Sequence, residues 1–230
     1  MGTDGWTFRK ALVAGAVVGL LSSAALGAYV WWSGGLEGSS VSADDVALVL
    51  VLPDEQGVAI PRTITRYRDG AATHVDPLAT ARIPGTTYDA LRDAYPFGGG
   101  AGVASALAEA QGTGSQVPAY VVVDLDGWLA LAATGGGPLT LDVPEHMEVF
   151  DGEWLYTFAE GVQRIEAGEV AALLSGAEYL EAPQRESLRI QVAEELARRL
   201  ATAAGAGAAD VARTNLTPEQ LEEWLAAVVQ

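Results

Sequence analysis

Two arginines one helical turn apart are the residues of this sequence best placed to bind an anion. Arg185 and Arg189 lie in the segment PQRESLRIQVAEELARRLATAA, whose pattern predicts a helix over 184–204. On a helical wheel both project from the apolar stripe that contains Leu188 and Val192, near the positive end of the helix dipole. A guanidinium that faces the core needs a partner, which is either an anion such as phosphate or one of the chain's own carboxylates.

Metal and nucleophile chemistry has few other candidates. Asp54, with Asp44 and Asp45, flanks the first predicted strand and could hold a divalent cation, although solvated acids at a turn explain the same residues. The two histidines, His74 and His146, are too few for a three-histidine metal centre, and the absence of cysteine excludes thiolate ligands and disulfides. The sequence has neither a phosphate-binding glycine loop nor the Gly-x-Ser-x-Gly motif of a serine hydrolase.

The composition excludes two classes of protein. The 230 residues include 30 Asp and Glu against 13 Lys and Arg, for a formal charge of -17, and half of them are hydrophobic. A disordered acidic tail would be far less apolar, and a nucleic-acid binder would need a basic face. We therefore expect a folded acidic domain and no nucleic-acid partner.

The N-terminal segment predicts an export signal or a membrane anchor. Residues 11–32 are apolar or small throughout and would rise about 33 Å as a helix, which is close to the hydrocarbon thickness of a bilayer. Arg9 and Lys10 precede the run and two tryptophans close it, so residues 1–10 are expected in the cytoplasm and the rest of the chain outside the cell membrane. A cleaved signal peptide, with small residues at 24–28, is the alternative. Residues 33–45 read as a Gly/Ser-rich linker.

Residues 46–230 alternate between strand and helix patterns. The run at 46–52 predicts a strand buried on both faces, whereas 64–70 predicts a half-exposed strand that ends at Asp-Gly. Further strands are expected at 71–76, 119–125 and 139–143, and a hairpin at 147–158. Helices are expected at 86–95, 102–112, 127–134 (capped by Asp126), 166–174, 184–204 and 218–229 (capped by Thr217). The order predicts a mixed α/β or α+β domain, a three-layer sandwich whose central mixed sheet is flanked by helices.

The order of three segments resembles one known family. IPGTTYDALRDAYPFGGG (83–100) is followed by VPAYVVVDLDGWLALAATGGGPLTLDVP (117–144) and then by the helix that carries Arg185 and Arg189. This arrangement, which spans about 46–200, is similar to that of the LytR-CpsA-Psr proteins. A single membrane helix before an exported domain is also the usual layout of that family.

The resemblance implies a fold, a ligand and an activity. It implies an α/β domain with a long apolar pocket for a polyprenyl chain, at whose mouth arginines and a magnesium-binding acid hold the lipid diphosphate. Family members transfer the glycopolymer from this carrier onto peptidoglycan. Arg185 and Arg189 fall in the helix of the family's diphosphate-binding arginines, Arg62 matches an arginine near the second strand, and Asp54 corresponds to the acid that would bind Mg²⁺.

Several positions depart from the family pattern. Leu78 and Ala79 stand where the family has an Arg-Asp pair, Thr63 cannot supply a metal carboxylate, and VAALLSGAEYL contains none of the expected arginines. We therefore expect a membrane-anchored extracytoplasmic binding or accessory protein of the cell envelope, which accepts a polyprenyl phosphate or diphosphate but has largely lost the transferase residues. The alternatives are a divergent glycopolymer phosphotransferase and a structural subunit of a membrane complex that binds other envelope proteins.

Overall fold

A computed structural model describes residues 42–83, 85–112, 118–135, 137–203 and 207–228 of the 230. The description below concerns the unit 41–230. The predicted membrane helix at 11–32 lies outside the described residues. Within the described ranges, no helix combines the length and the hydropathy needed to cross a membrane.

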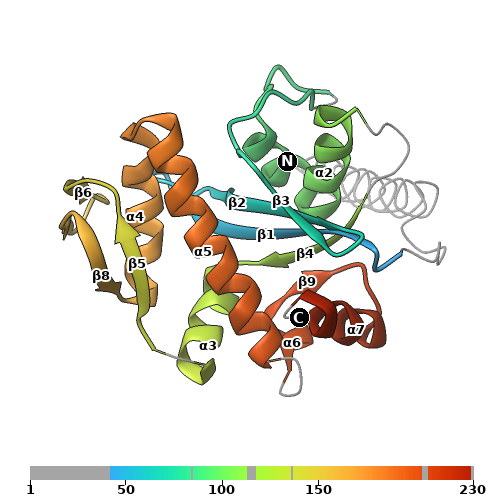
Figure 1. Ribbon diagram of the computed structural model, residues 1–230. Coiled ribbons are helices and arrows are strands. Elements are labelled where there is room, and N and C mark those ends of the chain that lie inside the picture. The colour runs from blue at the N-terminus through green and yellow to red at the C-terminus, as the bar shows by residue number, and fades with distance from the viewer. Residues whose placement is uncertain (1–41, 84, 113–117, 136, 204–206, 229–230) are drawn as a thin grey trace, which may run out of the picture. The chain divides into compact units, whose positions relative to one another are not determined.

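A five-stranded mixed sheet in the order β3-β2-β1-β4-β9 forms the centre of this unit (Figure 1). The middle strand β1 (Asp45–Pro53) is antiparallel to β2 (Ala59–Arg68) and parallel to β4 (Ala119–Val123). The edges are β3 (Ala71–Val75), which pairs with β2, and the short β9 (Arg213–Thr214), which pairs with β4. The sheet is therefore mixed, as the sequence predicts.

The side chains of β1 alternate between two apolar cores. Val46, Leu48 and Leu50 belong to one core, whereas Ala47 and Val49 belong to the other, and all five are buried. A strand covered on both faces has no polar face, which explains the unbroken apolar run at 46–52. The prediction of a doubly buried strand at this position is confirmed.

Helices cover both faces of the sheet (Figure 1). The first core packs the sheet against the long α5 and against shorter helices, whereas the second packs it against α2 and the 3-10 helix η1. The helices of the first face are α3 (Leu125–Gly135), α4 (Val170–Gly176), α5 (Ala182–Ala203), α6 (Ala208–Val211) and α7 (Pro218–Val228). Those of the second are η1 (Leu91–Asp93) and α2 (Ala94–Ala110). The prediction of a central mixed sheet flanked by helices is confirmed.

Two small antiparallel pairs extend this architecture. The hairpin of β6 (Met147–Phe150) and β7 (Leu155–Phe158) is confirmed, and the Asp151 carboxylate accepts hydrogen bonds from two backbone amides of its turn. A strand that the sequence analysis missed, β8 (Gly161–Ile165), pairs with β5 (Leu139–Val143). Two further 3-10 helices, η2 (Ala167–Glu169) and η3 (Ala177–Tyr179), flank α4.

Three local predictions were wrong. The helix expected at 86–95 begins only at Leu91, because the Thr86 hydroxyl accepts a hydrogen bond from the Tyr88 amide and donates one to a backbone carbonyl, which favours a turn. The N-cap of α3 is Asp124 rather than Asp126, since the Asp124 carboxylate accepts the Gly127 amide hydrogen. The strand expected to be half-exposed at 64–70 is buried over most of β2, because helices lie on both of its faces.

The capping box at the start of α7 is confirmed. The Thr217 hydroxyl accepts from the Gln220 amide at 3.3 Å, and the Gln220 side chain accepts from the Thr217 amide at 3.0 Å. We expect Thr217→Ala to lower the free energy of unfolding by about 1 kcal/mol, because the first turn loses its acceptor. Urea unfolding measures this loss, with Thr217→Ser as the control that keeps the hydroxyl. Equal stability of the Ala and Ser variants would contradict the prediction.

Candidate functional site

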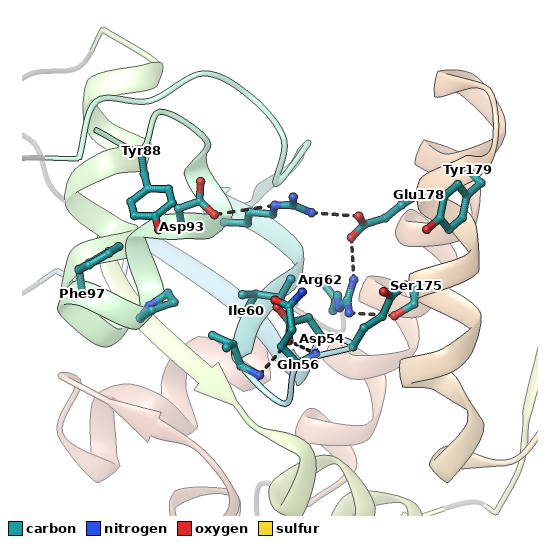
Figure 2. A pocket seen from close by; sticks show the side chains of 14 residues that line it. Asp54, Gln56, Ile60, Arg62, Tyr88, Asp93, Phe97, Ser175, Glu178 and Tyr179 are labelled. Carbon is teal, nitrogen blue, oxygen red and sulfur yellow. Dashed lines mark hydrogen bonds and ion pairs between the residues drawn. The ribbon is translucent and has the colours of Figure 1, made fainter. Parts of the chain in front are cut away.

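An open pocket of about 460 Å³ lies beside the C-terminal end of β1 (Figure 2). Its walls come from the β1–β2 turn, from η1 with the first turn of α2, and from the end of α4 with η3. The lining residues are Asp54, Glu55, Gln56, Val58, Ile60, Arg62, Tyr88, Arg92, Asp93, Pro96, Phe97, Ser175, Glu178 and Tyr179.

Arg62 reaches this pocket because of a β-bulge. Leu50 pairs with Thr63 and Val51 pairs with Pro61, so Arg62 is the additional residue of β2 at the shift in register. A bulge bends the strand locally and re-aims the side chain of the unpaired residue. The guanidinium, only 3% exposed, donates to the Pro53 carbonyl at 3.0 Å and to the Ser175 hydroxyl at 2.8 Å.

Glu178 joins Arg62 to a second arginine. Its Oε1 lies 2.6 Å from Nη1 of Arg62, and its Oε2 lies 2.9 Å from Nη1 of Arg92 (Figure 2). Arg92 comes from η1 and Glu178 from η3, so this carboxylate connects elements on two walls of the pocket. Burial lowers the pKa of Arg62, and the nearby carboxylates of Glu178 and Asp54 partly oppose this shift.

The pocket carries more negative than positive charge. Its lining has two cations, Arg62 and Arg92, against four carboxylates, so its formal charge is -2. Asp54, the predicted magnesium ligand, accepts the backbone amides of Gln56 and Val58 at 2.8 Å each and thereby shapes the β1–β2 turn. Among the described residues there is no group of three or more His, Cys, Asp or Glu that could hold a metal ion.

Arg185 and Arg189 lie outside this pocket and meet a carboxylate of the chain itself. Arg189 is buried, and its Nη1 lies 2.6 Å from Oδ1 of Asp76, while Nη2 of Arg185 lies 3.6 Å from Oδ2. Both arginines line a cavity of about 20 Å³, which has room for about one water molecule. Burial lowers the pKa of Arg189, and the Asp76 carboxylate opposes this shift. The structure therefore brings Arg62 and Asp54 together but places the other predicted pair elsewhere.

Solved structures with the same architecture are available for comparison. TagV of B. subtilis superposes with a TM-score of 0.56 at 14% identity, over 82% of this chain and 80% of that one. A LytR-Csp2A-Psr enzyme from Actinomyces oris superposes with a TM-score of 0.54 at 17% identity, over 82% and 77%. TagT bound to LI-WTA gives 0.52 at 14% identity, over 81% and 75%. The domain has the LytR-CpsA-Psr fold. No protein-family model and no curated protein sequence matches the chain.

The sequence analysis does not identify Arg92 or Glu178, the two charged residues that pair with each other in the pocket. In the LytR-CpsA-Psr pattern the segment before the last long helix carries arginines, and here the same segment, VAALLSGAEYL, supplies Glu178 instead. The absence of these arginines is evident from the sequence, but nothing in the sequence indicates where the Glu178 carboxylate points. Arg92 lies within the helix predicted at 86–95, and no motif in that segment distinguishes it from a surface arginine.

An aromatic rim also escaped prediction. Tyr88 and Phe97 lie on one side of the pocket with ring centroids 5.4 Å apart, and Tyr179 lies on the other side (Figure 2). All three side chains are more than half exposed. Their surface can accept apolar or sugar groups at the mouth of the pocket.

Proposed function

We propose that this domain is a membrane-anchored, extracytoplasmic binding or accessory protein of the cell envelope. Its ligand is a polyprenyl phosphate, a polyprenyl diphosphate or a similar lipid. The observation that carries the proposal is the convergence of Arg62 and Arg92 on one oxyanion, the Glu178 carboxylate, at the wall of an open pocket. Two guanidiniums arranged in this way also suit a phosphate group.

The fold and the rim support this choice of ligand. TagT, a protein of the same fold, has been solved bound to LI-WTA. The cavity at Arg185 and Arg189 is too small for a prenyl chain. In this proposal the lipid therefore lies along the exposed surface of Tyr88 and Phe97 beside the larger pocket. Attachment to the membrane through 11–32 would bring this pocket to the side on which such lipids present their head groups.

The charge of the pocket argues against transfer of the ligand. Phosphoryl transfer depends mainly on cations positioned around the phosphate. Here the single charge of Glu178 is shared between Arg62 and Arg92, and Asp54, which remains the proposed contact for Mg²⁺, is engaged by the backbone of its own turn. The arrangement favours binding without turnover.

A second candidate, a structural subunit that binds other envelope proteins, is favoured by a separate surface. Phe150, Trp154 and Leu155 of the β6–β7 hairpin are each more than 60% exposed. Apolar side chains gathered on one exposed element are typical of interaction surfaces.

Binding and release must be measured together to separate these functions. The full-length protein in detergent is mixed with a polyprenyl-diphosphate glycan and Mg²⁺, and bound glycan and released phosphate are followed in parallel. We expect saturable binding without release, weakened at least tenfold in Arg62→Ala but not in Arg213→Ala, which removes an arginine from the surface. Release abolished by Arg62→Ala would establish a transferase, and absence of both signals would favour the structural subunit.

A further inference from the structure

We propose that Glu178 is an internal competitor of the ligand, occupying the position between Arg62 and Arg92 that a phosphate group would take. This inference rests on the proposed function, because it concerns the same pocket. It makes Glu178 the residue that limits the affinity of the pocket for phosphate and diphosphate groups.

The contacts of Glu178 are those expected of a bound oxyanion. Its two oxygens approach the Nη1 atoms of two different arginines, at 2.6 and 2.9 Å. The other contacts of the Arg62 guanidinium, with Pro53 and Ser175, are to neutral oxygens, so Glu178 supplies the negative charge that this buried cation needs. Without that carboxylate, an anion from solution would meet the same requirement.

The Glu178 carboxylate is also exposed enough for a ligand to displace it from the two arginines. Its side chain is 25% exposed and that of Arg92 is 31% exposed, and both line the open pocket rather than the interior. η3 is a single 3-10 turn, so a change of side-chain rotamer can move the carboxylate into solvent without disturbing a long helix. A ligand that displaces Glu178 must replace both ion pairs, and this cost lowers its net affinity.

The neighbouring charges strengthen the competition. Asp54, Glu55 and Asp93 line the same pocket, so a phosphate that enters while Glu178 stays in place meets four carboxylates against two arginines, a formal charge of -2. Removing the Glu178 charge leaves both cations directed at one point that no longer carries a negative charge. The gain in affinity should therefore depend on Arg62 and Arg92 and not merely on the total charge of the domain.

The experiment compares Glu178→Gln with the wild type, using inorganic pyrophosphate as the probe and isothermal titration calorimetry as the readout. Both are full-length proteins in the same detergent and at the same ionic strength. We expect pyrophosphate to bind Glu178→Gln at least tenfold more tightly. Adding Arg92→Gln to that variant should abolish the gain.

Glu181→Gln is the matched control, because it removes the same charge from an exposed position three residues along the chain. A gain of equal size in Glu181→Gln, or no gain in a folded Glu178→Gln, overturns the inference. Circular dichroism verifies folding, and Glu178→Ser replaces the Gln variant if the latter unfolds.

The two proposals fail separately. If the wild type binds the lipid-linked glycan but Glu178→Gln gains nothing for pyrophosphate, the competitor is rejected and the proposed function stands. If neither protein binds the glycan or pyrophosphate, both are rejected.

Discussion

Replacing Trp128 with alanine is expected to lower the free energy of unfolding by about 3–5 kcal/mol, the range for truncation of a large buried aromatic side chain. Trp128 is fully buried in α3, and its indole Nε1 donates to the Ala167 carbonyl at 2.9 Å. The Arg199 guanidinium lies 5.2 Å from the centroid of its ring. Truncation therefore leaves a cavity, an unpaired carbonyl and a buried cation without its aromatic neighbour.

Urea unfolding followed by far-ultraviolet circular dichroism measures this loss. The matched control is Trp154→Ala, because Trp154 is 63% exposed on the β6–β7 hairpin and its removal leaves no cavity. A loss below about 1 kcal/mol in Trp128→Ala would mean that the core around α3 collapses onto the vacated space.

The second large effect is expected at Arg62. Arg62→Ala removes three hydrogen bonds and leaves Glu178 with one arginine instead of two. We therefore expect the free energy of unfolding to fall by about 3 kcal/mol, the lower end of the range for breaking a buried ion pair. Arg62→Lys should recover only part of it, because a single ammonium group cannot reproduce the geometry of a guanidinium that contacts three acceptors.

A double-mutant cycle shows whether the ion pair between Arg62 and Glu178 accounts for the loss of stability in Arg62→Ala. Arg62→Ala combined with Glu178→Gln should be more stable than the sum of the single changes predicts, because the second change removes the carboxylate that the first leaves under-compensated. Strict additivity, measured by urea unfolding of all four proteins, would show that the ion pair does not account for the loss.

Local patterns in the sequence predicted the elements that have one dominant signal. The apolar run of β1 and the apolar stripe of α5 each specify a buried surface, and both elements lie within a few residues of their predicted bounds. The wheel also placed Arg189 inward correctly, because the direction of a helical side chain follows from the helix period alone. The wheel does not decide whether the partner of Arg189 is an external anion or a carboxylate of the chain, and in the structure it is Asp76.

The functional pocket depends on contacts that no local pattern contains. Arg92 and Glu178 are 86 residues apart, and they meet although η1 packs in the core on one face of the sheet and η3 in the core on the other. Asp54 is a candidate from its place beside the first strand and Arg62 from the family resemblance, but the bulge that directs Arg62 into the pocket depends on the register between β1 and β2. Because β2 is buried on both faces, its sequence has no polar and apolar alternation that a one-residue shift in pairing would interrupt.

The contact of Glu178 with two arginines also acts as a cross-link. It fastens β2, η1 and η3 to one another in a chain that has no cysteine with which to do so covalently. Unlike a disulfide, this ionic contact needs no oxidant to form and resists any reductant, so its strength does not depend on the redox conditions in which the domain folds. A variant that opens the pocket by removing Glu178 would therefore also weaken the contacts between β2, η1 and η3. The same side chain thus limits access to the pocket and stabilises the fold around it.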